Sequence, residues 1–279
     1  MKRIDLNKIK EIILNLVKKA NFGLRSDVLS KLKEIYNVER GLSKKFVGLL
    51  IENARISSRK QFPLCQDTGI PILFVDIGED VVVPHRFKSF LLKSLESSYQ
   101  QLYLRNSIVS PLIRRNPGWG PGEVYFDISS NKRRIKFSLL VKGFGSENKT
   151  VLKMFNPTVS WSQIEEFIVS CVKTAGPDAC PPFIIGIGIG GTSEKACMLA
   201  KKTLFRNIYD SHPDKKIASL EKKLLEKINR LNLGVMGLGG KVTALGVKIE
   251  IYPTHIAGLP VCVNINCHAL RTSSIVYKL

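Results

Sequence analysis

The sequence predicts an α/β fold: a mixed sheet with flanking helices and a helical N-terminal region over residues 1–60. Apolar patterns of helical period alternate along the chain with short apolar runs that are typical of strands. No internal repeat or low-complexity linker interrupts them, and a chain of 279 residues can bury a substantial core. We therefore expect a single domain over residues 1–279.

Three helices are expected within residues 5–60, where apolar side chains such as Leu6, Ile9 and Ile13 recur at helical spacing. A loop over residues 61–69 leads to a strand at 71–77, followed by a long helix at about 85–105.

The next two strands, at residues 123–128 and 135–141, are expected to pair as a hairpin and to lead into a glycine-containing loop over 142–150. Such a loop can turn backbone N–H groups toward an anion. The remaining helices are expected over residues 160–174, 193–207 and 214–231, and the remaining strands after Pro182 and over 242–252 and 260–266, the last two closing the chain.

The composition is that of an ordinary globular protein with an excess of positive charge. Lys+Arg 43 against Asp+Glu 23 gives a net charge of +20, which fits nucleic acid, an acidic partner chain or an anionic substrate. The lysines are spread along predicted helices without interleaved aromatic residues, so a solvated surface is expected rather than a nucleic-acid-binding one.

The chain shows no signal for a membrane or for secretion. No apolar run reaches the roughly 18 residues of a transmembrane helix, and the first residues lack the apolar segment of a secretory signal. A cytoplasmic location is expected, in which cysteines stay reduced and act as ligands or core residues.

The six cysteines fall into different settings. Cys171 and Cys197 lie on apolar helix faces and are expected in the core, while Cys262, inside a strand, is ambiguous between a core residue and a ligand. The other three lie at element boundaries beside polar residues or proline: Cys65, Cys180 and Cys267. Three such thiolates can hold zinc or an iron–sulfur cluster, and spacing alone does not distinguish these from three unrelated loop cysteines.

Asp67 and His255 are the best candidates for acid/base chemistry, although a turn-forming aspartate and a structurally bonded histidine are equally ordinary readings. A small dianionic substrate would also need cations and N–H donors. Arg105, Arg114, Arg271 and the loop at residues 143–148 can supply them.

We reject the hypothesis that Gly186, Gly188 and Gly191 form a dinucleotide-binding site. These glycines match the fingerprint spacing, but two prolines precede the strand and no clear second strand precedes Asp210.

Six ordered motifs from about residue 40 to the end resemble one family. They are Leu-Cys65-Gln-Asp-Thr-Gly, Arg105-Asn-Ser-Ile-Val-Ser-Pro-Leu, Lys-Gly-Phe-Gly-Ser146-Glu-Asn-Lys, Gly-Pro-Asp-Ala-Cys180-Pro-Pro with the glycines after it, Gly237-Leu-Gly-Gly-Lys, and the segment from His255 to Cys267. Together they resemble the alpha part of iron–sulfur hydro-lyases of the class I fumarase and L-tartrate dehydratase type.

The resemblance implies a 4Fe-4S cluster ligated by Cys65, Cys180 and Cys267, with the fourth iron open to substrate. It further implies a substrate pocket lined by these residues: Gln66, Asp67, Arg105, Gly143, Gly145 and His255, with Asp67 and His255 in catalytic roles. The chain departs from the family pattern at residues 117–126, at Phe144 and at Val235.

The other half of these enzymes has no counterpart in this sequence, so the resemblance implies a separate beta subunit and an α2β2 heterotetramer. The expected reaction is hydration of a C4 dicarboxylate and its reversal, with fumarate and L-malate first and L-tartrate second. The alternative is a non-catalytic cluster-binding or nucleic-acid-binding protein of the same fold.

Overall fold

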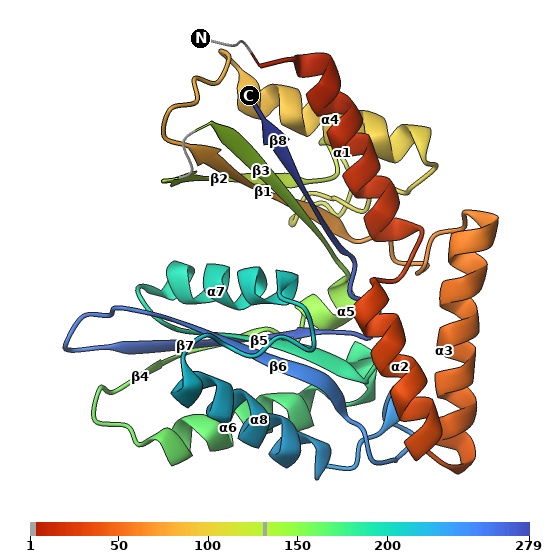
Figure 1. Cartoon of the computed structure of the whole chain (residues 1–279), viewed down its shortest axis with the longest axis vertical. Coiled ribbons are helices and arrows are strands. Elements are labelled where there is room, and N and C mark those ends of the chain that lie inside the picture. The colour runs from red at the N-terminus through yellow and green to blue at the C-terminus, as the bar shows by residue number, and fades with distance from the viewer. Residues whose placement is uncertain (1–3, 131–132) are drawn as a thin grey trace. The chain divides into compact units, whose positions relative to one another are not determined.

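Across the described residues, 4–130 and 133–279, the computed structural model contains two four-stranded mixed sheets with helices packed against them (Figure 1). The predicted α/β class is confirmed. The described residues group into a first unit, within Met1–Leu24, Ser57–Gly143 and Arg271–Leu279, and a second unit, Arg25–Ile56 and Phe144–Leu270. The prediction of a single domain over residues 1–279 stays a prediction.

The sheet of the first unit has the strand order β2, β1, β3, β8. Its strands are β1 (Ile70–Gly78), β2 (Glu123–Ser129), β3 (Arg134–Lys142) and β8 (Thr272–Lys278). The helices α1 (Leu6–Asn21) and α4 (Phe87–Gln101) pack against this sheet and against each other (Figure 1). Side chains such as Leu16, Leu91 and Phe137 join helices and strands in one core.

The predicted hairpin between the strands at 123–128 and 135–141 is wrong, because β1 lies between them. β1 pairs in parallel with β2 and antiparallel with β3. Its residues 71–75 are all buried, as a central strand requires, whereas Phe126 and Ile128 on β2 are exposed at the sheet edge. Asn131 and Lys132 of the connection lie outside the described residues.

The chain does not close on two strands as predicted, because β8 follows them and pairs antiparallel with β3. Ile275, Val276 and Tyr277 are of types that favour strands, so the local pattern was an available signal that the sequence analysis did not use. Ser273 donates a hydrogen bond to the backbone oxygen of Leu16 in α1 (2.8 Å), which ties the strand to the helix above it.

The sheet of the second unit has the order β4, β7, β5, β6. Its strands are β4 (Val151–Phe155), β5 (Phe183–Gly190), β6 (Ala244–Tyr252) and β7 (Leu259–Asn266). The helix α7 (Ser193–Lys202) covers one face, and α6 (Trp161–Ala175) and α8 (Lys215–Asn229) cover the other (Figure 1). Ser160 and Gln163 form a capping box that starts α6.

The three predicted amino-terminal helices are confirmed as α1, α2 (Ser26–Val38) and α3 (Gly41–Lys60). Buried polar contacts hold α2 to the second unit: the Asp27 carboxylate accepts a hydrogen bond from the Ile208 N–H (2.8 Å), and Arg25 donates to the Leu204 oxygen (2.9 Å). None of the helices in the described part of the chain has both the length and the apolar character needed to cross a membrane.

The glycine-containing loop predicted over 142–150 holds a short helix, α5 (Phe144–Glu147), and is followed by the unpredicted edge strand β4. Glu147 forms an ion pair with Lys201 and accepts a hydrogen bond from Asn264 (3.1 Å). These contacts to α7 and β7 order the segment, which local composition could not indicate. Two helices are shorter than predicted. The helix predicted over 85–105 ends at Gln101, and the one predicted over 193–207 ends at Lys202, where a 3-10 turn, Thr203–Phe205, follows.

The strands β5 and β6 are parallel, and α7 and α8 lie in the connection between them, so a crossover is present that the sequence analysis missed. The glycines of β5 serve helix packing. A Cβ at Gly186 would lie 2.1 Å from the Ala200 oxygen, and one at Gly188 would lie 2.0 Å from the Ala196 oxygen. The backbone of α7 therefore rests directly on β5, which gives these glycines a structural role without any dinucleotide.

Replacing Gly188 by alanine is predicted to destabilise the chain by about 2 kcal/mol or more, because α7 must move off the sheet. Thermal unfolding followed by circular dichroism measures the effect. Gly246→Ala on β6 is the matched control, since its Cβ would meet only the Ile208 side chain at 3.4 Å. Equal melting temperatures for the two variants would contradict this packing role.

Candidate metal and substrate site

Two of the predicted ligand cysteines lie at the same end of the second unit's sheet. Cys180 precedes β5 and Cys267 follows β7, and these strands are antiparallel with Ile184 opposite Asn266. The start of one strand therefore meets the end of the other. Strand pairing thus gathers two thiols that are far apart in the sequence.

The backbone at Cys180 is held from three directions. Cys180 adopts a left-handed conformation (φ 54°) after a 3-10 turn, Pro177–Ala179, and its N–H donates to the Pro177 oxygen (2.9 Å). Its own oxygen accepts from the His268 N–H (3.4 Å), and the Pro181 oxygen accepts from the Met236 N–H (2.9 Å). A left-handed residue other than glycine persists only where its surroundings hold it, so the loop presents the thiol in a defined direction.

His268 acts as a support for this loop. Its Nδ1 lies 3.2 Å from the Cys180 oxygen, and burial lowers the pKa of the imidazole, so the ring is neutral at pH 7. Because a carbonyl oxygen only accepts, Nδ1 carries the proton and donates it. His268 therefore supports the backbone of the Cys180 loop through this hydrogen bond.

The glycine segment before β6 supports the same loop. A Cβ at Gly237 would lie 2.4 Å from the Pro177 Cβ, so only glycine lets the two segments approach. Gly237 also has a positive φ of 75°, which a residue with a side chain rarely adopts. The Gly237-Leu-Gly-Gly-Lys motif thus has a packing function beside Cys180.

Burial separates the cysteines by chemical character. None of the six is in a disulfide; Cys171 and Cys262 are buried, and the others are partly exposed. Burial raises the pKa of Cys171 to about 11 and raises that of Cys262 as well, with the neighbouring Cys197 adding to the effect on Cys262. Thiols at these two positions stay protonated and are unsuited to metal ligation, which needs the thiolate.

In the first unit, the loop before β1 carries Cys65, Gln66 and Asp67, and its neighbours are fixed by hydrogen bonds. The Leu64 N–H donates to the Asn21 oxygen (2.7 Å) at the end of α1. On the other side, Thr68 donates through its hydroxyl to the Arg105 oxygen (2.6 Å). The loop is thus anchored on both sides of the three predicted site residues.

Tyr99 adds a buried contact beneath this loop. Its hydroxyl donates to the Thr68 oxygen (3.0 Å), and burial raises the pKa of the phenol, which keeps the donor proton in place. Thr68 is therefore held by both its side chain and its backbone.

Arg271 lies against Asp67 and Gly143. Its Nη1 donates a hydrogen bond to the backbone oxygen of Asp67 (2.7 Å). A Cβ at Gly143 would lie 3.0 Å from Nη2 of Arg271 and 3.3 Å from the Asp67 carboxylate. Arg271 is 3% exposed, and its Nε has no hydrogen-bond partner among the described residues. The structure therefore brings Asp67, Gly143 and a buried cation together.

The remaining predicted residues are distributed between the units. Arg105 belongs to the first unit and is exposed, while Gly145 lies in α5 of the second unit, where its Cβ would meet the Asp178 oxygen at 3.3 Å. Asp178 lies two residues before Cys180 and pairs with Lys149 (3.2 Å). Gly145 is therefore close to the Cys180 loop.

His255 is not near the two predicted ligand cysteines of the second unit, Cys180 and Cys267. It lies in the turn between β6 and β7, at the opposite end of the sheet from Cys180 and Cys267 (Figure 1). The length of β5 separates the two ends, about 23 Å at ~3.3 Å per residue. The exposed imidazole accepts from the Ala257 N–H at Nδ1 (3.1 Å), so in the neutral ring Nε2 carries the proton.

No group of three His, Cys, Asp or Glu side chains able to hold a metal ion is found within residues 4–130 and 133–279. Cys65 belongs to the first unit, and Cys180 and Cys267 belong to the second. The donor set nevertheless fits an iron–sulfur cluster in its chemistry: three partly exposed cysteine side chains on loops held by backbone hydrogen bonds.

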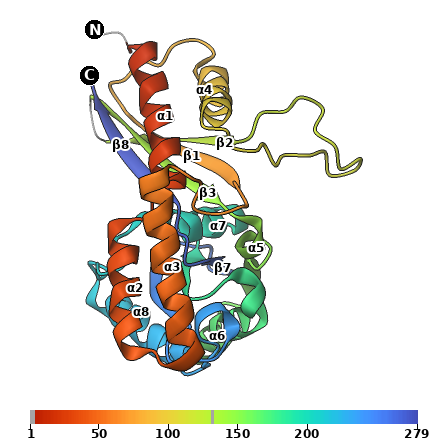
Figure 2. The same ribbon diagram turned by 90° about the vertical axis from the view of Figure 1, so that its right-hand side faces the viewer.

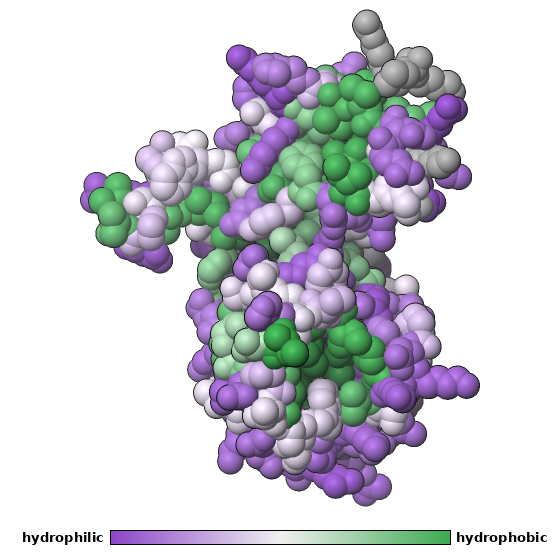
Figure 3. Space-filling model, turned by 90° about the vertical axis from the view of Figure 1, so that its left-hand side faces the viewer, coloured by the Kyte–Doolittle hydropathy of each residue, from purple (hydrophilic) through white to green (hydrophobic). Residues whose placement is uncertain are grey.

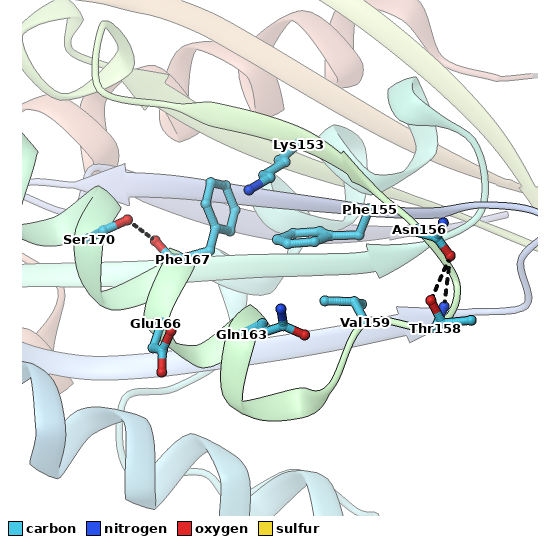
Figure 4. Close-up of a pocket in the computed structure, with 9 residues that line it drawn as sticks. All are labelled: Lys153, Phe155, Asn156, Thr158, Val159, Gln163, Glu166, Phe167 and Ser170. Carbon is cyan, nitrogen blue, oxygen red and sulfur yellow. Dashed lines mark hydrogen bonds between the residues drawn. The ribbon is translucent and has the colours of Figure 1, made fainter.

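The second unit also has a cavity of about 630 Å³ between β4 and α6 (Figure 4). The Lys153 ammonium lies over the Phe155 ring, 4.6 Å from its centroid, and Phe155 meets Phe167 edge-on. None of the predicted site residues lines this cavity, so it is separate from the cysteine loops.

Sequence reasoning missed the supporting roles of His268, Met236, Thr68 and Tyr99, and named Arg271 only as a general cation. His268 and Arg271 follow Cys267 directly in Cys-His-Ala-Leu-Arg, so proximity to a ligand was an available signal. Nothing local indicates Tyr99, because its contact to Thr68 spans 31 residues.

Comparisons with known proteins cover almost the whole chain. A model of the family described as fumarate hydratase (Fumerase) matches residues 10–276. A Methanocaldococcus jannaschii protein named "Putative L(+)-tartrate dehydratase subunit alpha" is 41% identical over 273 residues, which cover 95% of each chain. The L(+)-tartrate dehydratase subunit alpha of Escherichia coli is 28% identical over 280 residues, covering 99% of this chain and 92% of that protein.

These matches confirm the resemblance drawn from the six motifs, and they extend it to nearly the full length of the sequence. The chain belongs to the fumarate hydratase (Fumerase) family.

Proposed function

We propose that this chain is the alpha subunit of a 4Fe-4S hydro-lyase that adds water to, or removes it from, a C4 dicarboxylate. The observation that carries the proposal is the pair of displayed thiols, Cys180 and Cys267, held at one end of the sheet in a chain of this family. The names of the two relatives support a hydro-lyase and favour L-tartrate over fumarate as the first substrate to test.

In this proposal Cys65, Cys180 and Cys267 hold the cluster. When bound, such a cluster supplies a Lewis-acidic iron for a substrate hydroxyl and carboxylate. Gln66 and Arg105, both exposed, bind substrate oxygens, and the backbone at Gly143 and Gly145 donates N–H groups. Asp67 moves a proton at its carboxylate, and Arg271 orients it through the backbone contact at 2.7 Å.

A separate beta subunit completes the proposed enzyme. The relatives are named as alpha subunits, which supports a second chain of a different kind. We propose an α2β2 assembly in the cytoplasm, where the ligand thiols stay reduced. The net charge of +20 then favours association with an acidic beta chain.

The first test is iron and sulfide content with a visible spectrum, on the chain purified without oxygen. About four irons and four sulfides per chain are expected. Cys180→Ser should lose the cluster, and Cys197→Ser, which alters another partly exposed thiol of the same unit, should keep it. A full cluster in both variants would refute the ligand assignment, and zinc or no metal after anaerobic reconstitution would refute the hydro-lyase.

With purified beta subunit added, the loaded chain should dehydrate L-tartrate and hydrate fumarate at different rates. The dehydration is followed by the gain in absorbance of its unsaturated product, and the hydration by the loss of absorbance of fumarate. The chain alone should show little turnover. Activity with neither substrate in the presence of a bound beta subunit would contradict the proposed substrate class.

His255 is too far from Cys180 and Cys267 of its own chain to act at a cluster that they hold. In one chain the imidazole is about 23 Å along the sheet from the loops of Cys180 and Cys267, at ~3.3 Å per residue of β5. We propose that His255 serves the cluster of a second copy of the chain, which the α2β2 assembly provides.

Complementation tests this arrangement. His255→Gln and Cys180→Ser chains, each with beta subunit, should lose at least about 100-fold in activity. When they are refolded or co-expressed together, about a quarter of wild-type activity should return, because half of the mixed dimers' sites are intact.

The matched control mixes Cys180→Ser with Cys267→Ser, two lesions at the same sheet end, and should recover nothing. If the His255→Gln chain is inactive and the Cys180→Ser chain does not restore activity, His255 acts on the cluster of its own chain. A fully active His255→Gln chain would remove the residue from the mechanism.

A further inference from the structure

A long segment of the first unit has no part in the proposed site chemistry beyond Arg105. It joins the end of α4 at Gln101 to the start of β2 at Glu123 and extends away from the sheet (Figure 2). We call residues 102–122 the arm. Connections of this length without helix or strand are uncommon in a compact domain unless they have a function.

The arm is ordered by its own hydrogen bonds. Asn106 and Asn116 both donate from their side-chain amides to the Trp119 oxygen (2.6 and 3.0 Å). Nearer the tip, the Ser110 N–H donates to the Arg115 oxygen (2.9 Å). The two legs are thus joined at the base and at the tip, so the arm holds one shape instead of collapsing onto the sheet.

The tip presents apolar side chains to solvent. Every residue from 111 to 119 is exposed, and Leu112 and Ile113 are 90% and 65% exposed. Figure 3 shows apolar surface on the projecting part of the arm. Adjacent branched aliphatic side chains held in water by an ordered loop mark a surface that a partner covers.

The charge and residue types of the arm indicate the partner's chemistry. Arg105, Arg114 and Arg115 are exposed, and no acidic residue occurs from residue 97 to residue 122. Arginine, tyrosine and tryptophan are enriched at the centres of protein interfaces, and Tyr103 and Trp119 are 95% and 50% exposed. Aliphatic side chains at the tip have no use against phosphates, which favours a protein face over nucleic acid.

We propose that the arm is the docking element for the separate beta subunit. Leu112 and Ile113 enter an apolar socket on that subunit, and Arg114 and Arg115 pair with carboxylates at its rim. The inference rests on the proposed function, since the occupant is the second chain of that enzyme.

The experiment titrates the full chain with purified beta subunit and measures affinity by calorimetry. Replacing Leu112 and Ile113 together by aspartate should weaken binding roughly tenfold or more, because it places charge in the socket. Replacing Arg114 and Arg115 by glutamate should also weaken binding and reduce its dependence on salt concentration.

Val82→Asp is the matched control, an exposed apolar residue (68%) of the same unit between β1 and α4. It should bind within about twofold of wild type. All variants alter exposed side chains, and equal thermal unfolding by circular dichroism shows that each is folded.

The outcomes separate the two proposals. If wild type binds the beta subunit and both arm variants bind equally well, the arm inference is overturned and the proposed function stands. If wild type does not bind the beta subunit at all, the two-subunit function and the arm inference are both overturned. A separate titration uses a labelled single-stranded oligonucleotide. If only the arginine variant loses oligonucleotide binding, and its affinity for the beta subunit is unchanged, the arm is a nucleic-acid-binding surface instead.

Discussion

The antiparallel pairing of β5 with β7 is the constraint on which the candidate metal site depends. It places the residue before one strand beside the residue after the other, and so brings Cys180 and Cys267 to one end of the sheet. The parallel pairing of β5 with β6 sends the turn that holds His255 to the opposite end. One pattern of hydrogen bonds therefore gathers two predicted ligands and separates a third predicted site residue, His255, from them.

Close backbone approach, made possible by glycine, recurs around these loops. Gly186 and Gly188 let α7 rest on β5, and Gly237 lets its segment reach Pro177 beside Cys180. In the first unit, Gly143 leaves room for the Arg271 guanidinium next to Asp67. Gly186, Gly188 and Gly237 are therefore packing positions, because protein atoms fill the space that a side chain would need at each.

Burial determines which cysteines can form a thiolate and which charged groups are shielded from water. Cys171 and Cys262 are kept as thiols by the cost of burying a thiolate, whereas Cys65, Cys180 and Cys267 stay partly exposed on fixed loops. Arg271 is buried beside Asp67, and its Nε has no hydrogen-bond partner in the part of the chain that the structure describes. The arm differs, because its apolar side chains Leu112 and Ile113 are exposed to solvent on an ordered loop.

The sequence by itself determined the family, the α/β class and the helices with strong apolar periodicity, such as α1, α6 and α8, because these depend on local spacing and on ordered motifs. It also identified which cysteines lie at element boundaries. Only the tertiary structure decided that β1 lies between β2 and β3, that β8 pairs with β3, and that His255 lies far from Cys180 and Cys267. Strand neighbours are chosen by pairing between segments far apart in the sequence, and the local pattern of residues does not specify which segments pair.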